Sequence, residues 1–302
     1  MNLNYQYIEN EYASTAKQIY ELETIVKKGG PDKSEYNKLR EIAISLKDMS
    51  LEEELELYEI FKPILTIDSI IGHTFLKPYG YAGDYELIDK IYQKRVSADP
   101  FLAKWDHYYH DANSATAVRN RKSYFIKQIN RCINTRKTSR ILNLGSGPCR
   151  DVYEYYSSNE GEKTFIDCLD MDKNALDHGA KVCADFIDNI TFINKNAFRY
   201  KADNKYNLIW SAGLFDYFSD KLFIRLTNRM YQMLHKGGEL IIGNFSDKNP
   251  GREEMEVFGK WYLHHRSEKT LINLAIKAGI ERHNITISSE YTGVNLFLHI
   301  KK

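Results

Sequence analysis

The 302-residue sequence contains no long hydrophobic run, almost no excess charge of either sign and only four cysteines. No stretch reaches the roughly 18 consecutive apolar residues that a transmembrane helix needs, so no membrane span is expected. The amino-terminal segment also lacks the basic and then apolar order of a secretory signal peptide. We therefore expect a soluble, cytoplasmic protein.

The charges are nearly balanced, since 42 lysines and arginines stand against 41 acidic residues. A net charge of +1 provides no basic excess to attract the phosphates of a nucleic acid, and a nucleic-acid partner is therefore not favoured. The four cysteines show no CxxC pair or other zinc-ligand spacing. We expect buried, reduced thiols and predict no metal site.

Residues 1–135 contain few glycines, and their apolar residues recur at the three-and-four spacing of amphipathic helices. Ser50 stands where a helix cap is expected. The aromatic stretch from Asp99 to Asp111 interrupts the pattern and is expected to form a loop. The region as a whole is predicted to be all-helical. Its helices are predicted at about 8–26, 32–47, 51–62, 86–95 and 114–135.

After Lys137, short apolar segments alternate with helical segments of 10 to 15 residues. Such alternation predicts a parallel sheet with right-handed crossovers. One of these helices is expected to continue up to the glycine pair Gly237-Gly238. The last two strands are separated by a short turn and should form an antiparallel hairpin. Strands are predicted within 140–145, 164–172, 190–198, 206–217, 239–245, 281–291 and 293–302.

The first predicted strand leads into the glycine-rich turn NLGSGPCRD at residues 143–151. A glycine turn between a strand and a helix lets the backbone approach a ligand, and the helix N-terminus offers unpaired N–H groups. The next strand ends in Asp170, where an acid can bind ribose hydroxyls. The pattern is GxGxC rather than GxGxxG, which disfavours a pyrophosphate. A ligand with a ribose but no phosphate fits better.

Five segments follow one another in the order and at the spacing of a known family: ILNLGSGPCRD, CLDMDKNAL, INKNAF, YNLIWSAGLFDYF and LHKGGELIIGNF. Residues 138–302 thereby resemble the class I S-adenosylmethionine-dependent methyltransferases. The resemblance implies a methyltransferase with S-adenosyl-L-methionine as its cofactor. It also implies an α/β fold, with a Rossmann-like seven-stranded sheet and an antiparallel last strand. The predicted domains are an all-helical, acceptor-covering cap at 1–135 and the methyltransferase domain at 136–302.

The resemblance also implies where the cofactor is bound. The two glycines of the turn would lie beside the methionine moiety, Asp170 on the ribose and Asn196 near the adenine amino group, while Ser211 to Leu214 would line the methyl-transfer site. Asn143 stands where the family usually has an acid. The predicted cofactor-binding residues of this domain are Gly145, Ser146, Gly147, Asp170, Met171, Asn196, Ala197, Ser211, Ala212 and Gly213.

Two further cofactor ligands are predicted on the helix that precedes the first strand. Either Arg119 or Arg121 could clamp the cofactor carboxylate with a bidentate guanidinium. The alternative is a solvated helix face. Residues two apart in a helix cannot share one face, so the two arginines should differ in their surroundings.

The segments HTFLKPYGYAGDYELIDKIY, AVRNRKSYF, SAGLFDYF and WYLHHRS resemble a bacterial methyltransferase subgroup that makes a 3-hydroxypalmitic acid methyl ester signal. This second resemblance spans nearly the whole chain and implies a fatty-acid carboxyl as acceptor. A carboxylate is already ionised at neutral pH, so it requires orientation, a dry site and hydrogen-bond donors rather than a general base. We therefore predict O-methylation of a carboxylate of a small acyl molecule.

Four residues are predicted to act on the acceptor. Tyr81 lies in a tyrosine-rich, glycine-interrupted segment that suits either a lid or a packed turn, and the nearby Asp84 could instead cap the following helix. Asn244 ends the fifth strand, at an edge where ligands collect. His264 and Arg266 could hold a carboxylate, or the histidine could accept a proton. A core or surface position is the alternative for the histidine.

Other functions stay open on the sequence alone. One is methylation of a peptide or protein carboxylate, or of a small-molecule amine or hydroxyl. Another is a non-catalytic S-adenosylmethionine-binding interaction module, because a fold does not determine a substrate. A deep apolar tunnel would favour the acyl acceptor and an open groove a peptide. The sequence leaves the oligomeric state undetermined.

Overall fold

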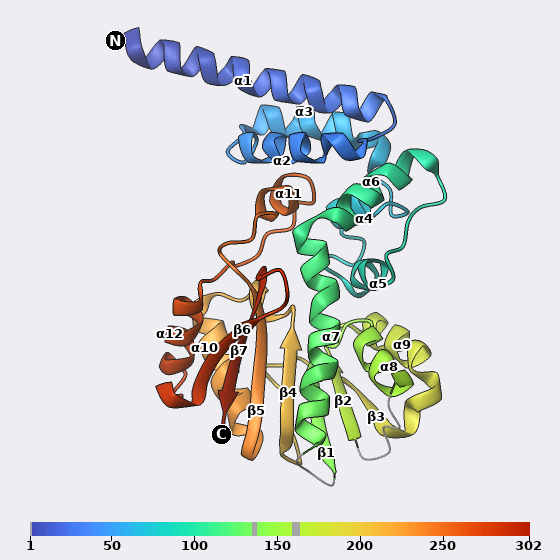
Figure 1. The fold of residues 1–302 in the computed structure, drawn as a ribbon, viewed down its shortest axis with the longest axis vertical. Coiled ribbons are helices and arrows are strands. Elements are labelled where there is room, and N and C mark those ends of the chain that lie inside the picture. The colour runs from blue at the N-terminus through green and yellow to red at the C-terminus, as the bar shows by residue number, and fades with distance from the viewer. Residues whose placement is uncertain (1, 135–137, 159–163) are drawn as a thin grey trace. The chain divides into compact units, whose positions relative to one another are not determined.

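The computed structural model describes residues 2–134, 138–158 and 164–302, and Figure 1 shows their helices and strands. The chain forms two compact units, each assembled from separate stretches of sequence. The boundary predicted between residues 135 and 136 lies outside the described residues, and the division into cap and methyltransferase domain stays a prediction. Unit 1 comprises residues 1–83, 93–115 and 250–262, and unit 2 comprises residues 84–92, 116–249 and 263–302.

Unit 1 is helical, as the spacing of its apolar residues predicts. Its core contains Leu22, Leu39, Phe61, Trp105 and Phe258, all of them buried. The unit therefore includes apolar side chains from both ends of the sequence. Its elements are α1 (Asn2–Lys27), η1 (Lys33–Glu35), α2 (Tyr36–Ser45), α3 (Leu51–Phe61), η2 (Lys62–Ile64), α4 (Ile70–Leu76), α6 (Pro100–Asp111) and α11 (Arg252–Val257).

The loop predicted between Asp99 and Asp111 is wrong, because this stretch forms helix α6. An Asp99 side-chain oxygen accepts a hydrogen bond from the Phe101 N–H at 2.8 Å, and Pro100 occupies the first helical turn, where its missing N–H costs nothing. Trp105 and other aromatic residues of the helix are buried in the unit 1 core. The aromatic residues are thus core residues of a helix.

Unit 2 is built on a seven-stranded sheet in the order β3-β2-β1-β4-β5-β7-β6. The strands from β3 to β5 are parallel, whereas β7 is antiparallel to both of its neighbours, β5 and β6. The predicted fold class and its antiparallel last strand are confirmed. The strands are β1 (Ser139–Leu144), β2 (Thr164–Asp170), β3 (Ile190–Asn194), β4 (Tyr206–Ala212), β5 (Leu234–Phe245), β6 (Ile285–Ser289) and β7 (Asn295–Lys301).

Helices cover both faces of this sheet (Figure 1). Successive residues of a strand point to opposite faces, so Ile141 packs with Phe125 on one side, and Leu142 packs with Leu226 on the other. The sheet thus separates two apolar cores. The helical elements, some shared at their ends with unit 1, are α5 (Tyr85–Gln93), α7 (Asn113–Ile133), α8 (Arg150–Ser158), α9 (Lys173–Val182), η3 (Ala184–Asn189), η4 (Phe215–Tyr217), α10 (Asp220–Gln232), α12 (Glu268–Lys277) and η5 (Arg282–Asn284).

The helix predicted up to the glycine pair ends earlier, at Gln232, and β5 already begins at Leu234. The Tyr206 N–H donates to the Met233 carbonyl at 2.9 Å, and Leu234 pairs with Tyr206. Residues 234–238, which helical spacing alone would add to the helix, therefore belong to β5, which pairs with β4.

Two properties that the composition suggested are also visible. All four cysteines are free and buried, as expected. Among the described residues, no helix combines the length and the apolar character needed to cross a membrane.

Candidate active site

The glycine-rich turn joins β1 to α8 at the carboxyl edge of the sheet. The N–H groups of Gly145 and Ser146 donate to the Leu169 carbonyl at 2.8 and 3.2 Å, which fixes the turn to the end of β2. Gly145 has a φ of +69°, and a Cβ there would lie 3.1 Å from the Cβ of Leu214. Both the backbone conformation and the close approach therefore favour glycine at this position.

Asp170 contacts the same turn from the end of β2. Its Oδ2 accepts a hydrogen bond from the Gly147 N–H at 3.0 Å, and its Oδ1 accepts one from the Asp172 N–H at 3.0 Å. Burial raises the pKa of this carboxyl, although the backbone hydrogen bonds act in the opposite direction. A carboxylate has about four acceptor positions, so capacity for ribose hydroxyls remains. The structure thus brings two predicted cofactor residues, Gly147 and Asp170, into direct contact.

The other predicted residues of the turn and strand ends differ in exposure. The Ser146 hydroxyl is buried and has no hydrogen-bond partner among the described residues. Met171 is 71% exposed, and Ala197 is half-buried. Asn196 is exposed, and its side-chain oxygen accepts a hydrogen bond from the Phe198 N–H at 2.9 Å. The asparagine thereby shapes its own turn.

The end of strand β4 contributes two predicted residues, Ser211 and Ala212, and a third, Gly213, directly follows it. Ser211 is buried, and its hydroxyl donates to the Leu144 carbonyl at 2.8 Å, so it joins β4 to the end of β1. Ala212 and Gly213 are half-buried. Gly213 has a φ of +134°, and a Cβ there would lie 2.9 Å from Nη1 of Arg121. Only a residue without a side chain leaves room for this guanidinium.

The two predicted arginines of α7 have different surroundings, as their spacing requires. Arg121 is 5% exposed, and its Nε donates to the Tyr92 hydroxyl at 3.3 Å. Arg119 is half-buried, and its Nη2 donates to the Thr116 hydroxyl at 2.9 Å. Of the two, Arg121 is the one that lies against the carboxyl end of β4.

Three of the four residues predicted to act on the acceptor are brought together in unit 2. Nη1 of Arg266 donates to the Asn244 side-chain oxygen at 2.8 Å, and the Asn244 amide donates to the His264 carbonyl at 2.9 Å. The His264 N–H donates to the Asp216 carbonyl at 2.8 Å, while the imidazole is exposed. Tyr81 belongs to unit 1, where it is 39% exposed, and is not one of the residues that unit 2 assembles.

Arg266 makes several further contacts. Its Nη1 and Nη2 donate to the carbonyls of Phe215 and Phe218, at 3.2 and 2.5 Å. Its Nε and Nη2 donate to Oδ1 of Asp220 at 3.2 and 3.1 Å. The guanidinium also lies over the ring of Phe223, with 4.9 Å between Cζ and the ring centroid. Arg266 therefore ties the segment after β4 to the segment after β5.

Comparison with known proteins places this fold in a family. The profile of a methyltransferase domain family matches residues 135–291, which is more than half of the chain. The chain belongs to this family. It is a class I S-adenosylmethionine-dependent methyltransferase, so the enzyme class and the cofactor expected from the strand-end motifs are confirmed.

Individual relatives of the methyltransferase are distant. A possible exported protein from Bordetella parapertussis is 16% identical, with a TM-score of 0.66 over 97% of this chain and 96% of that one. The S-adenosylmethionine-dependent methyltransferase SibL is 11% identical, with a TM-score of 0.53 over 87% of this chain and 74% of that one. These two likenesses concern the fold alone.

One curated relative is similar in sequence. It is the malonyl-[acyl-carrier protein] O-methyltransferase 1 of Ilyobacter polytropus, which is 26% identical over 114 residues. The matched segment is 38% of this methyltransferase and spans 41% of the relative's own length.

Two buried acids of the methyltransferase were not among the predicted site residues. Asp216 is 1% exposed; its Oδ1 accepts a hydrogen bond from the Phe245 N–H at 2.6 Å, and its Oδ2 has no partner among the described residues. Burial raises the pKa of Asp216 to about 6, against the opposing influence of Arg121 and Arg266. Burial likewise raises the pKa of Asp151 to about 6. Asp151 and Asp216 lie within the strand-end motifs ILNLGSGPCRD and YNLIWSAGLFDYF, which is the signal that points to them.

Proposed function

We propose that this methyltransferase transfers a methyl group from S-adenosyl-L-methionine to a carboxylate oxygen of a small acyl molecule. The observation that carries the proposal is the similarity to a malonyl-[acyl-carrier protein] O-methyltransferase, whose name places the methyl acceptor on an acyl group. The resemblance of several segments to the subgroup that makes 3-hydroxypalmitic acid methyl ester supports the same acceptor class.

The residues at the glycine turn fit the cofactor. The turn is open at Gly147, where no described atom beyond its chain neighbours lies within 4 Å of the position that a Cβ would take, and the buried Ser146 hydroxyl is a polar group in need of a partner. We assign Asp170 to the ribose hydroxyls and the Arg121 guanidinium to the cofactor carboxylate. When bound, S-adenosyl-L-methionine supplies an electrophilic methyl group on a sulfonium.

For this reaction the protein has to align the acceptor carboxylate with the methyl group of the cofactor and to exclude water from the site. A carboxylate with a pKa of about 4 is already a nucleophile at neutral pH, so no residue has to remove a proton. We propose that His264, Asn244, Arg266 and Tyr81 orient the acceptor. Because the Arg266 donors are engaged within the protein, contact with an acceptor would require exchange of one of these bonds. We further propose that the helical region covers the acceptor.

The cofactor assignment is tested by Asp170→Ala. Hydrogen bonds to a charged acceptor contribute about 1.5–3 kcal/mol, so affinity for S-adenosylhomocysteine should fall roughly 10- to 150-fold. Calorimetry measures the dissociation constants of both proteins. Asp188→Ala, which removes an exposed acid beyond α9, is the matched control and should bind like the wild type. Unchanged affinity in Asp170→Ala would contradict the placement of the cofactor.

The acceptor class is tested by the pH dependence of turnover. A panel of fatty acids, acyl thioesters, amines, phenols and peptides first identifies the best acceptor by product mass. With a carboxylate, the rate should show no essential basic group between about pH 6 and 9, and His264→Gln should cause only a modest loss. His283→Gln, at a second exposed histidine, is the control.

Two results would count against the carboxylate acceptor. A limb titrating near pH 6.5 that disappears in His264→Gln would indicate general-base catalysis on a hydroxyl or amine. Cofactor binding without methyl transfer to any member of the panel would instead favour a non-catalytic binding module.

A further inference from the structure

Helix α5 belongs to the helical amino-terminal half of the sequence, yet residues 84–92 are part of unit 2. Asp84 caps the helix, because its Oδ1 accepts hydrogen bonds from the N–H groups of Glu86 and Leu87 at 3.0 and 2.9 Å. Leu87 and Ile91 are fully buried. The helix is therefore a fixed part of the unit that contains the glycine turn.

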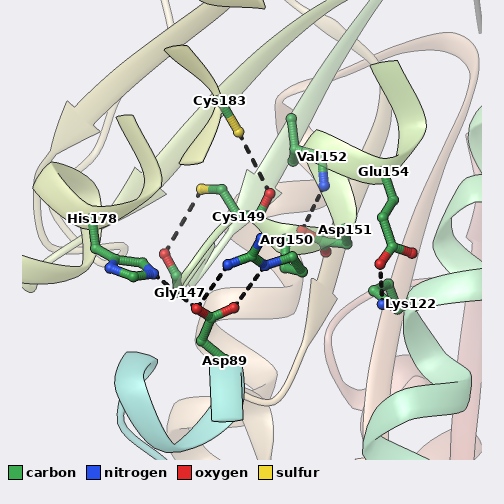
Figure 2. A network of polar contacts seen from close by, with 10 residues as sticks. All are labelled: Asp89, Lys122, Gly147, Cys149, Arg150, Asp151, Val152, Glu154, His178 and Cys183. Carbon is green, nitrogen blue, oxygen red and sulfur yellow. Dashed lines mark hydrogen bonds and ion pairs between the residues drawn. The ribbon is translucent and has the colours of Figure 1, made fainter. Parts of the chain in front are cut away.

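Asp89 of α5 is the centre of a polar network (Figure 2). Its two carboxylate oxygens accept hydrogen bonds from Nε and Nη2 of Arg150 at 2.8 and 2.9 Å. Nε2 of His178 lies 3.1 Å from Oδ2 of the same carboxylate. The Asp89 side chain is only 7% exposed, and a bidentate pair shielded from water is strong and directional. One carboxylate thus joins α5, α8 and α9.

The Arg150 side of this network is directly coupled to the glycine turn. Arg150 is the first residue of α8, and the preceding Cys149 has a φ of +54°, which is unusual for a residue other than glycine. The Cys149 N–H donates to the Ser146 carbonyl at 3.2 Å, and its Sγ lies 3.7 Å from the Gly147 carbonyl oxygen (Figure 2). A shift of Arg150 would therefore be transmitted to the turn.

The same helix contacts a second predicted cofactor residue. The hydroxyl of Tyr92 accepts the hydrogen bond from Nε of Arg121 at 3.3 Å. The Lys122 ammonium lies over the Tyr92 ring, 5.3 Å from its centroid, which adds a cation–π contact. Tyr92 therefore constrains the guanidinium that lies against Gly213.

We infer that Asp89 and Tyr92 of α5 are positioning residues for the amino-acid end of the cofactor. Asp89 holds the glycine turn in place through Arg150, and Tyr92 orients Arg121. The hydrogen bonds described above for Asp89 and Tyr92 go to Arg150, His178 and Arg121, whereas Asp170, the proposed ribose ligand, is reached only indirectly, through the Gly147 N–H of the turn. Helix α5 should therefore affect affinity for the amino-acid end more than affinity for the nucleoside. This inference rests on the cofactor site proposed above.

The experiment compares two ligands that share a nucleoside. S-adenosylhomocysteine has the amino-acid end, whereas 5′-methylthioadenosine lacks it. Asp89→Asn should weaken S-adenosylhomocysteine about tenfold but 5′-methylthioadenosine by less than about twofold, and Tyr92→Phe should show the same selectivity with a smaller loss of about threefold. Asp177→Asn, at an exposed α9 ion pair with Lys173, should change neither affinity.

Melting temperatures of the ligand-free proteins separate positioning from stability. A lower melting temperature with unchanged affinity for both ligands would overturn the inference, and so would an equal loss for both ligands. Asp89→Glu, which keeps the carboxylate, should recover part of the affinity for S-adenosylhomocysteine that Asp89→Asn loses. If Asp89→Asn does not fold, Arg150→Lys takes its place, because it keeps the charge but loses the bidentate geometry.

Asp170→Ala in the same assay tests the proposed site itself, and it should weaken both ligands because both contain the ribose. No effect of Asp170→Ala would overturn the cofactor placement. Loss of affinity in Asp170→Ala combined with wild-type selectivity in Asp89→Asn would overturn only the role of α5.

Discussion

Among its described residues, unit 2 buries two arginines, Arg121 against Gly213 after β4 and Arg266 after β5, and their surroundings differ. Arg266 donates to two backbone carbonyls, to Asn244 and to Asp220. Within the part of the chain that the structure describes, Arg121 makes a single hydrogen bond, to Tyr92. A guanidinium has five N–H donors, so Arg121 has donors in reserve for an anion and Arg266 has few. Burial alone therefore does not distinguish a structural arginine from a ligand-binding one.

The largest effect that this comparison predicts is on folding. Arg266→Met should lower the free energy of unfolding by about 3–5 kcal/mol, because it leaves buried acceptors without their donor. Urea denaturation measures the change. Arg225→Met, at an exposed arginine of α10, should cost less than about 0.5 kcal/mol. A comparably small loss in Arg266→Met would show that Arg266 is not a structural arginine and would remove its distinction from Arg121.

The next effect concerns the acid next to the glycine turn. Burial raises the pKa of Asp151 from 3.8 to about 6, so between these values the folded protein binds a proton that the unfolded chain has released. This group therefore makes the free energy of unfolding fall as the pH rises from about 4 to 6. The upper limit is about 3 kcal/mol, from about two units of pKa.

Asp151→Asn removes this titration. Measured by urea denaturation, the stability of the variant relative to the wild type should therefore increase as the pH rises from 4 to 6.5. A difference that does not depend on pH would show that Asp151 titrates in the folded protein as it does in the unfolded chain.

The smallest effect in free energy, but the most informative about function, is expected at the other arginine. Arg121→Met should weaken S-adenosylhomocysteine by about 1.5–3 kcal/mol while destabilising the fold less than Arg266→Met does. Calorimetry and urea denaturation are read side by side. Arg119→Met, two residues away on α7, is the control and should lose less affinity. A larger loss in Arg119→Met than in Arg121→Met would assign the cofactor carboxylate to Arg119 instead.

The parts of the site that could be predicted from the sequence are those defined by residues close together in the chain. The turn around Gly145 and the acid at the end of β2 could be identified because glycine content, strand pattern and spacing are local properties. Their pairing is visible in the hydrogen bond from the Gly147 N–H to Asp170. Sequence spacing also anticipated that Arg119 and Arg121 would differ.

The partners of the arginines could not be predicted in this way. Asp89 and Arg150 are 61 residues apart in the chain, and Tyr92 and Arg121 are 29 residues apart. No local pattern relates such pairs, because only the packing of α5 within unit 2 brings them together. The sequence of the tyrosine-rich segment indicates either a lid or a packed turn, with Asp84 as an alternative cap of the following helix, and the side chain of Asp84 does cap α5.

Helix α6 was missed for a different reason, since its start signal is present in the sequence. Asp99 followed by Pro100 is a typical cap and first helical residue, but the dense aromatic side chains after it obscured the helical spacing. Helix α11 has no comparable signal. The burial of Phe258 in unit 1 depends on partners such as Phe61, from the opposite end of the chain.

The interleaving of the two units has a consequence for the order of events during synthesis. At about 5–20 residues per second, the 61 residues between Asp89 and Arg150 take roughly 3–12 seconds to be added, and until then α5 has no partner for its carboxylate. The core of unit 1 is completed later still, because Phe258 is added only after most strands of the sheet have been synthesised. The unit 1 core can therefore be completed only after residue 262 has been added, before β6 and β7 complete the sheet of unit 2, and the apolar faces of the unit 1 helices are exposed to aggregation until then.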